Sequence, residues 1–129
     1  MMQQISLYLT SIILGIMLFF SFVVAPVTFT ALNEENARKF IRKIFPYYYI
    51  VNLAISILVL ILFIILKIFS LDFYLISCVA VLFAVSNFVL MPMINKFRDE
   101  KRDKKFKQSH FISVVINSVQ MILLIIILV

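Results

Sequence analysis

The chain has 129 residues, of which 64% are hydrophobic, and it carries a formal net charge of +6. A soluble domain of this length leaves a large share of its surface in water, so the composition excludes an ordinary soluble protein. The 14 Phe residues exclude disorder, because disordered chains are poor in aromatic side chains. The Lys and Arg residues lie in short runs between apolar stretches, so we expect no nucleic-acid partner.

Four stretches without Asp, Glu, Lys or Arg predict the fold, and they cover about 5–32, 44–66, 73–95 and 109–129. Each approaches or exceeds the roughly 20 residues that a helix needs to cross the hydrocarbon of a bilayer. Backbone groups in lipid must be hydrogen-bonded within their own segment, so helices are predicted rather than open strands. We therefore predict an all-α integral membrane four-helix bundle, built from two helical hairpins as a single domain over 1–129.

The connections between these helices differ sharply in charge. Eleven of the 12 Lys and Arg side chains fall in 33–43 and 96–107, whereas only Lys67 lies between the second and third helices. The positive-inside rule predicts that both basic loops are cytoplasmic and that both termini are outside. We expect a multi-pass protein of a bacterial inner membrane. The first helix is expected to remain uncleaved, because its apolar run exceeds the roughly 7–15 residues of a signal-peptide core.

The basic loops are expected to face lipid headgroups, and each base near the surface of an anionic leaflet contributes about 1 kcal/mol of attraction. The predicted partners are therefore the lipid bilayer and anionic headgroups at the cytoplasmic face, with further copies of the chain as a candidate. The bases expected at the headgroups are Arg38, Lys39, Arg42, Lys43, Arg98, Lys101, Arg102, Lys104 and Lys105.

Residue types that carry common chemistry are scarce. The chain has one Cys and one His, so it predicts neither an intrachain disulfide nor a metal-ligand cluster. No Asp or Glu lies inside a predicted helix, which leaves no members for an intramembrane proton relay through carboxylates. We therefore predict no catalytic residues and no metal site, and the sequence names no cofactor.

Each predicted helix carries one stripe of small or polar residues. On the last helix His110, Ser113, Asn117 and Gln120 follow at steps of three and four, which places them on one face. One interpretation is that the stripes are packing seams, where each interhelical hydrogen bond adds about 0.6 kcal/mol. The stripes of the other helices are Ser77, Ala80, Ala84 and Asn87; Asn52 and Ser56; and Ser11 and Gly15, continued by Phe22 and Pro26.

The depth of these residues supports a second interpretation. The two prolines free backbone carbonyls, which are tolerated at membrane depth only where protein or water satisfies them. A polar pocket open to the cytoplasm is the alternative to dry packing. Under the predicted topology its candidate members share the cytoplasmic half: Pro26, Asn52, Asn87, Pro92, His110, Ser113 and Asn117.

Two further patterns concern the helix ends and the two halves of the chain. Pro46 suits the first turn of the second helix, and the three Tyr residues at 47–49 that follow it are predicted to anchor at the headgroups. Each half also runs helix, Pro, basic loop, then a helix bearing Asn. Duplication of a hairpin explains this echo, and chance explains it nearly as well.

Several short motifs also resemble a known family. They are Gly15, Phe20, Pro26 and Phe29; Phe45, Pro46 and Tyr48; Asn87 to Met91 with Pro92, Asn95 and Arg98; and Phe106, His110, Ser113 and Asn117. Together they resemble the transmembrane protein 205-like family of small four-helix membrane proteins, also filed as domain of unknown function 4149. The anthrone-oxygenase-like group has a similar plan. The first resemblance implies the four-helix topology but no established activity.

Three functions remain open at this point. The favoured one is a non-enzymatic scaffold or small-ligand binder with a polar cluster in its cytoplasmic half. The first alternative is a subunit of an oligomeric transporter or channel, because four helices are few for a solitary carrier. The second is a redox or oxygenase-like enzyme acting on a lipophilic substrate, with His110 and Asn117 in its site.

Overall fold

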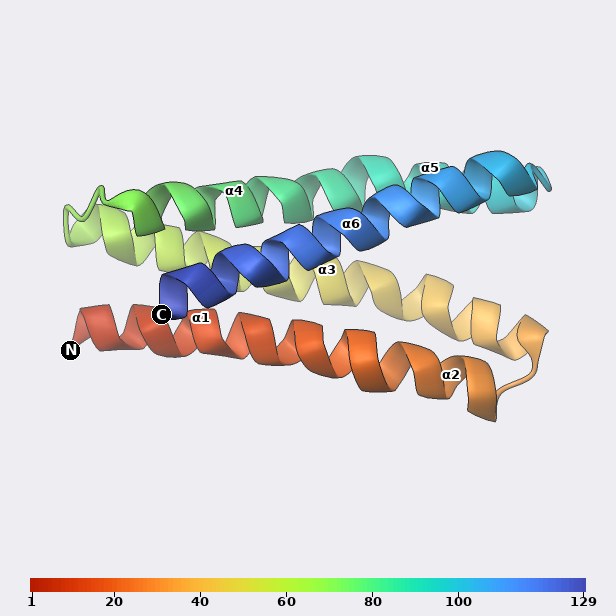
Figure 1. Cartoon of the computed structure of the whole chain (residues 1–129), viewed down its shortest axis with the longest axis horizontal. Helices are drawn as coiled ribbons and strands as arrows, with labels where there is room; N and C mark the ends of the chain where they lie inside the picture. The colour runs from red at the N-terminus through yellow and green to blue at the C-terminus, as the bar shows by residue number, and fades with distance from the viewer.

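The computed structural model describes all of residues 1–129 as four long helical segments lying side by side, with both termini at one end (Figure 1). All four segments are long and apolar enough to cross a membrane, which confirms the predicted all-α architecture. The elements in chain order are α1 (Met2–Phe19), η1 (Phe20–Val24), α2 (Ala25–Ala31), α3 (Glu34–Ile65), α4 (Leu71–Val85), η2 (Ser86–Leu90), α5 (Met91–Asp99) and α6 (Asp103–Leu128).

The helices extend well beyond the uncharged stretches. The second segment begins at Glu34, where the Asn33 side chain accepts a hydrogen bond from the Asn36 backbone N–H at 2.9 Å. Ion pairs one turn apart then support a helix outside the apolar stretch, such as Glu35 with Lys39 at 3.0 Å. The basic residues predicted in loops therefore lie mostly on helix ends. Pro46, predicted in a first turn, lies inside α3 instead.

Two π-helical turns interrupt the first and third segments at matching places. The Ala25 N–H bonds the Phe20 carbonyl just before Pro26, and the Met91 N–H bonds the Ser86 carbonyl just before Pro92. Proline has no N–H and disturbs the helical hydrogen bonds of the preceding turn, and a π turn is one way to accommodate the disturbance. The echo between the two halves of the sequence thus extends to the backbone.

The bundle is most closely packed in the half that contains the chain termini. There α1 and α4 each pack against both α3 and α6. The side chains at its centre are fully buried, and hydroxyl groups among them bond their own helix, as Ser56 does to the Asn52 carbonyl at 2.8 Å. Gln120 crosses between helices and donates to the Val79 carbonyl at 3.0 Å. The fully buried core residues include Ile13, Met17, Val59, Ile76, Phe83 and Leu124.

The seam predicted on the first helix is wrong. Ser11 and Gly15 face outward, and no atom of another helix lies within 4 Å of the place where a Cβ on Gly15 would be. The buried face of α1 instead carries Thr10, Ile13 and Met17. Larger side chains at steps of three and four fill the space between helices, so a pair of small residues does not by itself mark the contact face.

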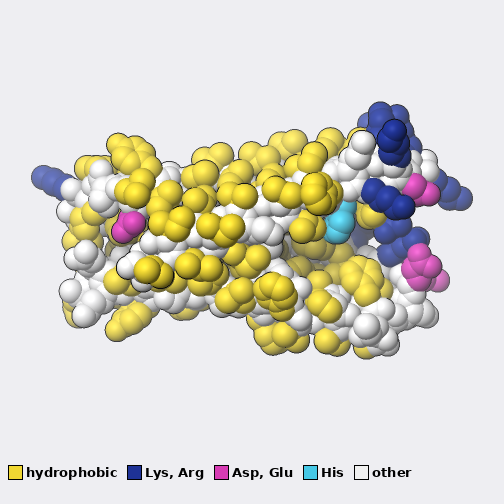
Figure 2. All heavy atoms as spheres, in the orientation of Figure 1, with side chains coloured by type: hydrophobic (Ala, Val, Ile, Leu, Met, Phe, Trp, Pro, Cys, Tyr) yellow, Lys and Arg dark blue, Asp and Glu magenta, His cyan; other side chains and the backbone are white.

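The outer surface is apolar over the body of the bundle, and most of its charged side chains gather at one end (Figure 2). Phe22, Tyr74 and Phe111 are more than 60% exposed, and many Leu, Ile and Val side chains are exposed beside them. A surface of this kind is too apolar for a protein in water, and lipid is the solvent that suits it. The charged end contains the α2–α3 and α5–α6 connections, so we call it the basic end.

Candidate functional site: a cavity at the basic end

A cavity of about 760 Å³ opens at the basic end between the two hairpins. Here α2 packs on α3, and α5 packs on α6, so that the packing stays largely within each hairpin. Figure 1 shows α6 and α2 diverging toward this end. Figure 2 shows the surface hollowed beside the single His, with basic side chains on one side of the hollow and apolar side chains on the other.

Aromatic side chains form the inner wall of the cavity. The rings of Phe20 and Tyr48 are stacked with centroids 4.3 Å apart, and Phe45 meets Phe20 edge to face at 5.2 Å. Tyr48 and Tyr49 are buried and line the cavity, whereas Tyr47 is 66% exposed. The prediction that all three anchor at the headgroups is therefore wrong for two of them, because successive helical residues point in directions about 100° apart.

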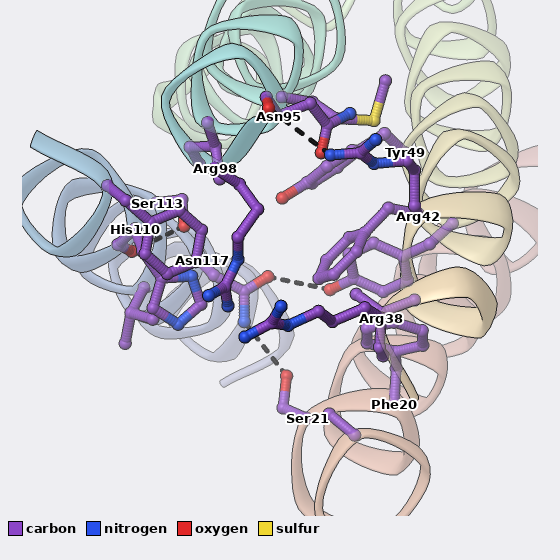
Figure 3. Close-up of a pocket in the computed structure, with 18 of the residues that line it drawn as sticks. Phe20, Ser21, Arg38, Arg42, Tyr49, Asn95, Arg98, His110, Ser113 and Asn117 are labelled. Atoms are coloured by element: carbon purple, nitrogen blue, oxygen red, sulfur yellow. Dashed lines mark hydrogen bonds between the residues drawn. The ribbon is translucent and has the colours of Figure 1, made fainter. Parts of the chain in front are cut away.

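A chain of polar groups crosses the cavity floor and joins three helical segments (Figure 3). The Tyr48 hydroxyl donates to the Asn117 Oδ1 at 2.8 Å, and the Asn117 Nδ2 donates to the Ser21 Oγ at 3.1 Å. Asn117 thus uses both ends of its amide, one toward α3 and one toward η1. This network fixes the depth at which the cavity ends.

Ion pairs hold most of the basic side chains near the cavity mouth. Arg42 bonds the Asp99 carboxylate at 2.9 Å and contacts the Asn95 carbonyl at 3.4 Å, which links α3 to α5 across the two hairpins. Arg38 pairs with Glu34, one turn earlier on its own helix. These pairs are exposed, and exposed pairs contribute at most about 1 kcal/mol each.

Arg98 differs from the other cavity arginines because no carboxylate pairs with it. Its guanidinium lies 4.0 Å from the centroid of the Phe106 ring. That ring in turn lies parallel to the His110 imidazole, with centroids 5.8 Å apart. Figure 3 shows the guanidinium groups of Arg98 and Arg38 pointing toward each other from opposite walls, beside His110.

The structure brings together some of the predicted pocket residues and separates the others. His110, Ser113 and Asn117 line the cavity. Asn52 and Asn87 are buried instead in the packed part of the bundle, where each amide oxygen has no hydrogen-bond partner. The two prolines do not line the cavity either. Of the nine predicted headgroup bases, five line the cavity: Arg38, Lys39, Arg42, Arg98 and Lys101.

Sequence reasoning missed several residues of the site. Ser21 belongs to no stripe that we recognised, because the π turn changes the helical register around it. Tyr48 and Phe106 line the cavity but were not among the predicted pocket residues. The family motifs contain both, and each lies one helical turn from a predicted pocket residue, Asn52 or His110. No group of three or more His, Cys, Asp or Glu side chains is placed to hold a metal ion.

Fold and cavity together define a class, that of a small polytopic membrane protein whose four helices enclose a cavity at a basic end. The chain belongs to the family described as a domain of unknown function (DUF4149), whose sequence model matches residues 8–103. No curated protein and no solved structure matches the chain. The match ends at the start of α6, so His110 and Asn117 lie beyond it. It confirms the domain of unknown function, but not the resemblance to transmembrane protein 205.

Proposed function

We propose that the protein is a non-enzymatic membrane protein that binds one small amphiphilic ligand in the cavity at its basic end. The observation that carries this proposal is the cavity itself. Its volume of about 760 Å³ falls within the roughly 300–1,000 Å³ of small-molecule sites. Its aromatic wall and its few convergent polar groups are also typical of such sites.

The polar groups of the cavity favour binding over catalysis. Proton-transfer catalysis needs a base within hydrogen-bond reach of the group from which it takes the proton. The His110 imidazole forms no hydrogen bond to another side chain, and its neighbour in the cavity is the Phe106 ring. Tyr48, Asn117 and Ser21 bond one another, so their polar atoms hold helices together.

Native mass spectrometry of the protein released from detergent tests ligand binding. We expect a single bound amphiphile on the parent chain and its loss in Ser113→Phe, because the added ring fills the cavity. Ser11→Phe is the matched control, since Ser11 is exposed on α1 away from the cavity. Retention of the ligand by Ser113→Phe, or a parent chain that carries none, would contradict the proposal.

We further infer that the basic end faces the cytoplasm, that both termini lie outside, and that the exposed bases contact anionic headgroups. The uneven charge of the two ends supports this orientation. The test is labelling with an impermeant maleimide in a Cys78→Ser background. Lys104→Cys should react only in inside-out vesicles and Lys67→Cys only in right-side-out vesicles. The reverse pattern would overturn the orientation.

A further inference from the structure

An arginine without an acidic partner marks the cavity as a site for an anion. Four ion pairs use Arg38, Lys39, Arg42 and Arg102, but Arg98 and Lys101 have no carboxylate partner and both line the cavity. The Arg98 guanidinium lies over the face of the Phe106 ring and forms no hydrogen bond or ion pair with another residue, which leaves its N–H groups available. A bound anion would supply the negative charge that no carboxylate of the chain supplies to these two bases.

The arrangement of the two facing arginines indicates the kind of anion. Arg38 and Arg98 reach into the cavity from α3 and α5, and their guanidinium groups point toward each other (Figure 3). Arg38 pairs with Glu34 of its own helix but Arg98 has no carboxylate partner, so the facing pair keeps a net positive charge that an anion between them would offset. A carboxylate presents two oxygens in one plane and matches one guanidinium fork. A terminal phosphate presents three oxygens and up to two charges, so it can bond both forks at once.

The side of the cavity opens toward lipid as well as toward water. Phe22 and Phe29 line the cavity, yet they are 69% and 60% exposed on the outer surface. Across the opening, Val114 of α6 lines the cavity and is 47% exposed. Because α2 packs on α3 rather than on α6, an apolar chain can pass between α2 and α6 while its polar end lies inside.

We propose that the ligand is a lipid with a terminal phosphate, drawn from the leaflet at the basic end. Its phosphate lies between Arg38 and Arg98 with His110 beside it, and its tail leaves between α2 and α6. This inference rests on the proposed function and names the class of ligand. It differs from general attraction of the bases to headgroups, because only the arginines inside the cavity matter to it.

Two features favour the lipid over its competitors. A free phosphate would occupy a small part of the 760 Å³ and would gain nothing from the apolar lip at Phe22 and Phe29. A phosphatidylcholine headgroup would bring a quaternary ammonium into a space that already holds unpaired positive charge, which is repulsive. A lipid with a terminal phosphate places its phosphate beside the arginines and its tail against the apolar lip.

Photocrosslinking in nanodiscs tests the proposal. Discs of phosphatidylcholine contain a small fraction of either phosphatidic acid or phosphatidylcholine with a diazirine in the acyl chain, and labelled residues are mapped by mass spectrometry. We expect labelling at Phe22, Val114 and Met121 about tenfold stronger with the phosphatidic acid probe. R38Q/R98Q should lose that excess. K104Q/K107Q, which removes two exposed charges outside the cavity at the same end, should keep it.

The outcomes separate the possibilities. Equal labelling by the two probes, or equal loss in both double variants, would overturn the phosphate lipid while leaving ligand binding in place. Displacement of the label by soluble glycerol 3-phosphate at the concentration of the probe would show that free phosphate is the ligand and would also overturn it. If the parent chain carries a bound adduct in native mass spectrometry but takes no lipid label, only this inference is refuted. If the parent chain carries no adduct, the proposed function is refuted too.

Discussion

The two ends of the bundle are built from the same four helical segments but differ in what holds them together. At the end with the termini, large apolar side chains such as Phe83 and Leu124 are fully buried, and a single side-chain hydrogen bond, from Gln120, crosses between helices. At the basic end, polar contacts run between segments, from Tyr48 to Asn117 and from Arg42 to Asp99. One end is a packed core, whereas the other end contains a cavity that is bordered by polar contacts between helices.

The difference shows how little force closes a helix bundle in lipid. Lipid tails are as apolar as Leu, so helices associate through close packing and hydrogen bonds rather than through expulsion of water. Where side chains interdigitate, as around Phe83, the bundle closes. Where the prolines and π turns change the register and bases line the mouth, the hairpins separate, and a few polar contacts set the width of the gap.

The largest expected contrast is in the accessibility of matched serines. In a Cys78→Ser background, Ser113→Cys should react with a water-soluble maleimide at least about a hundredfold faster than Ser56→Cys, which reacts only when the bundle opens locally. The pair is matched because both hydroxyls bond a carbonyl of their own helix, at 2.6 and 2.8 Å. Similar rates would mean that the basic end is as dry as the core.

Removing a core ring at the closed end should cost the most stability. Phe83 is fully buried, so Phe83→Ala leaves a void in the core. The unfolded state in a membrane keeps Phe in lipid, so the void dominates and the loss should be about 2 kcal/mol. Phe106→Ala at the cavity edge should lose less than half as much. Reversible unfolding in mixed micelles measures both, and equal losses would remove the contrast between the ends.

The polar network at the basic end should be worth less than the core ring. Asn117→Ala removes one hydrogen bond to Tyr48 and one to Ser21, and at about 0.6 kcal/mol each the loss should be about 1 kcal/mol. Ser118→Ala is the control, because its hydroxyl bonds only the Val114 carbonyl of its own helix. A double-mutant cycle with Tyr48→Phe should give a coupling of similar size to one bond. Zero coupling would show that the two groups act independently.

The smallest expected changes are those in the free energy of unfolding on replacing two arginines, and they differ in sign. Arg42→Gln breaks the exposed pair with Asp99 that links the hairpins and should cost at most about 1 kcal/mol, less in high salt. Arg98→Gln breaks no ion pair, so without ligand it should leave stability unchanged or raise it by a few tenths of a kcal/mol. The same unfolding measurement compares them at two salt concentrations. A larger loss for Arg98→Gln would mean that this side chain is structural.

Much of the fold could be predicted because lipid imposes strict rules on sequence. The uncharged stretches of sufficient length form helices that are long and apolar enough to span a membrane, and His110, Ser113 and Asn117, predicted on one helix face, all line the cavity. Other parts could not be predicted. Asn52, Asn87 and Asn117 look alike in the sequence, because each is an Asn within an apolar helix. Asn52 and Asn87 face packed neighbours and Asn117 faces the cavity, and only the packing distinguishes them. The burial of Tyr48 and Tyr49 likewise depends on which helix faces them.

By itself the sequence determined the solvent of the chain, the number of helical segments and the concentration of charge at one end, because hydropathy and charge act residue by residue. The tertiary structure alone decided which polar residues surround a cavity and which of the cavity arginines has no carboxylate partner. Those properties depend on pairs from different helices, such as Arg42 with Asp99, and pairing leaves Arg98 unmatched. The spacing of residues along one helix cannot specify the distance between residues on two different helices.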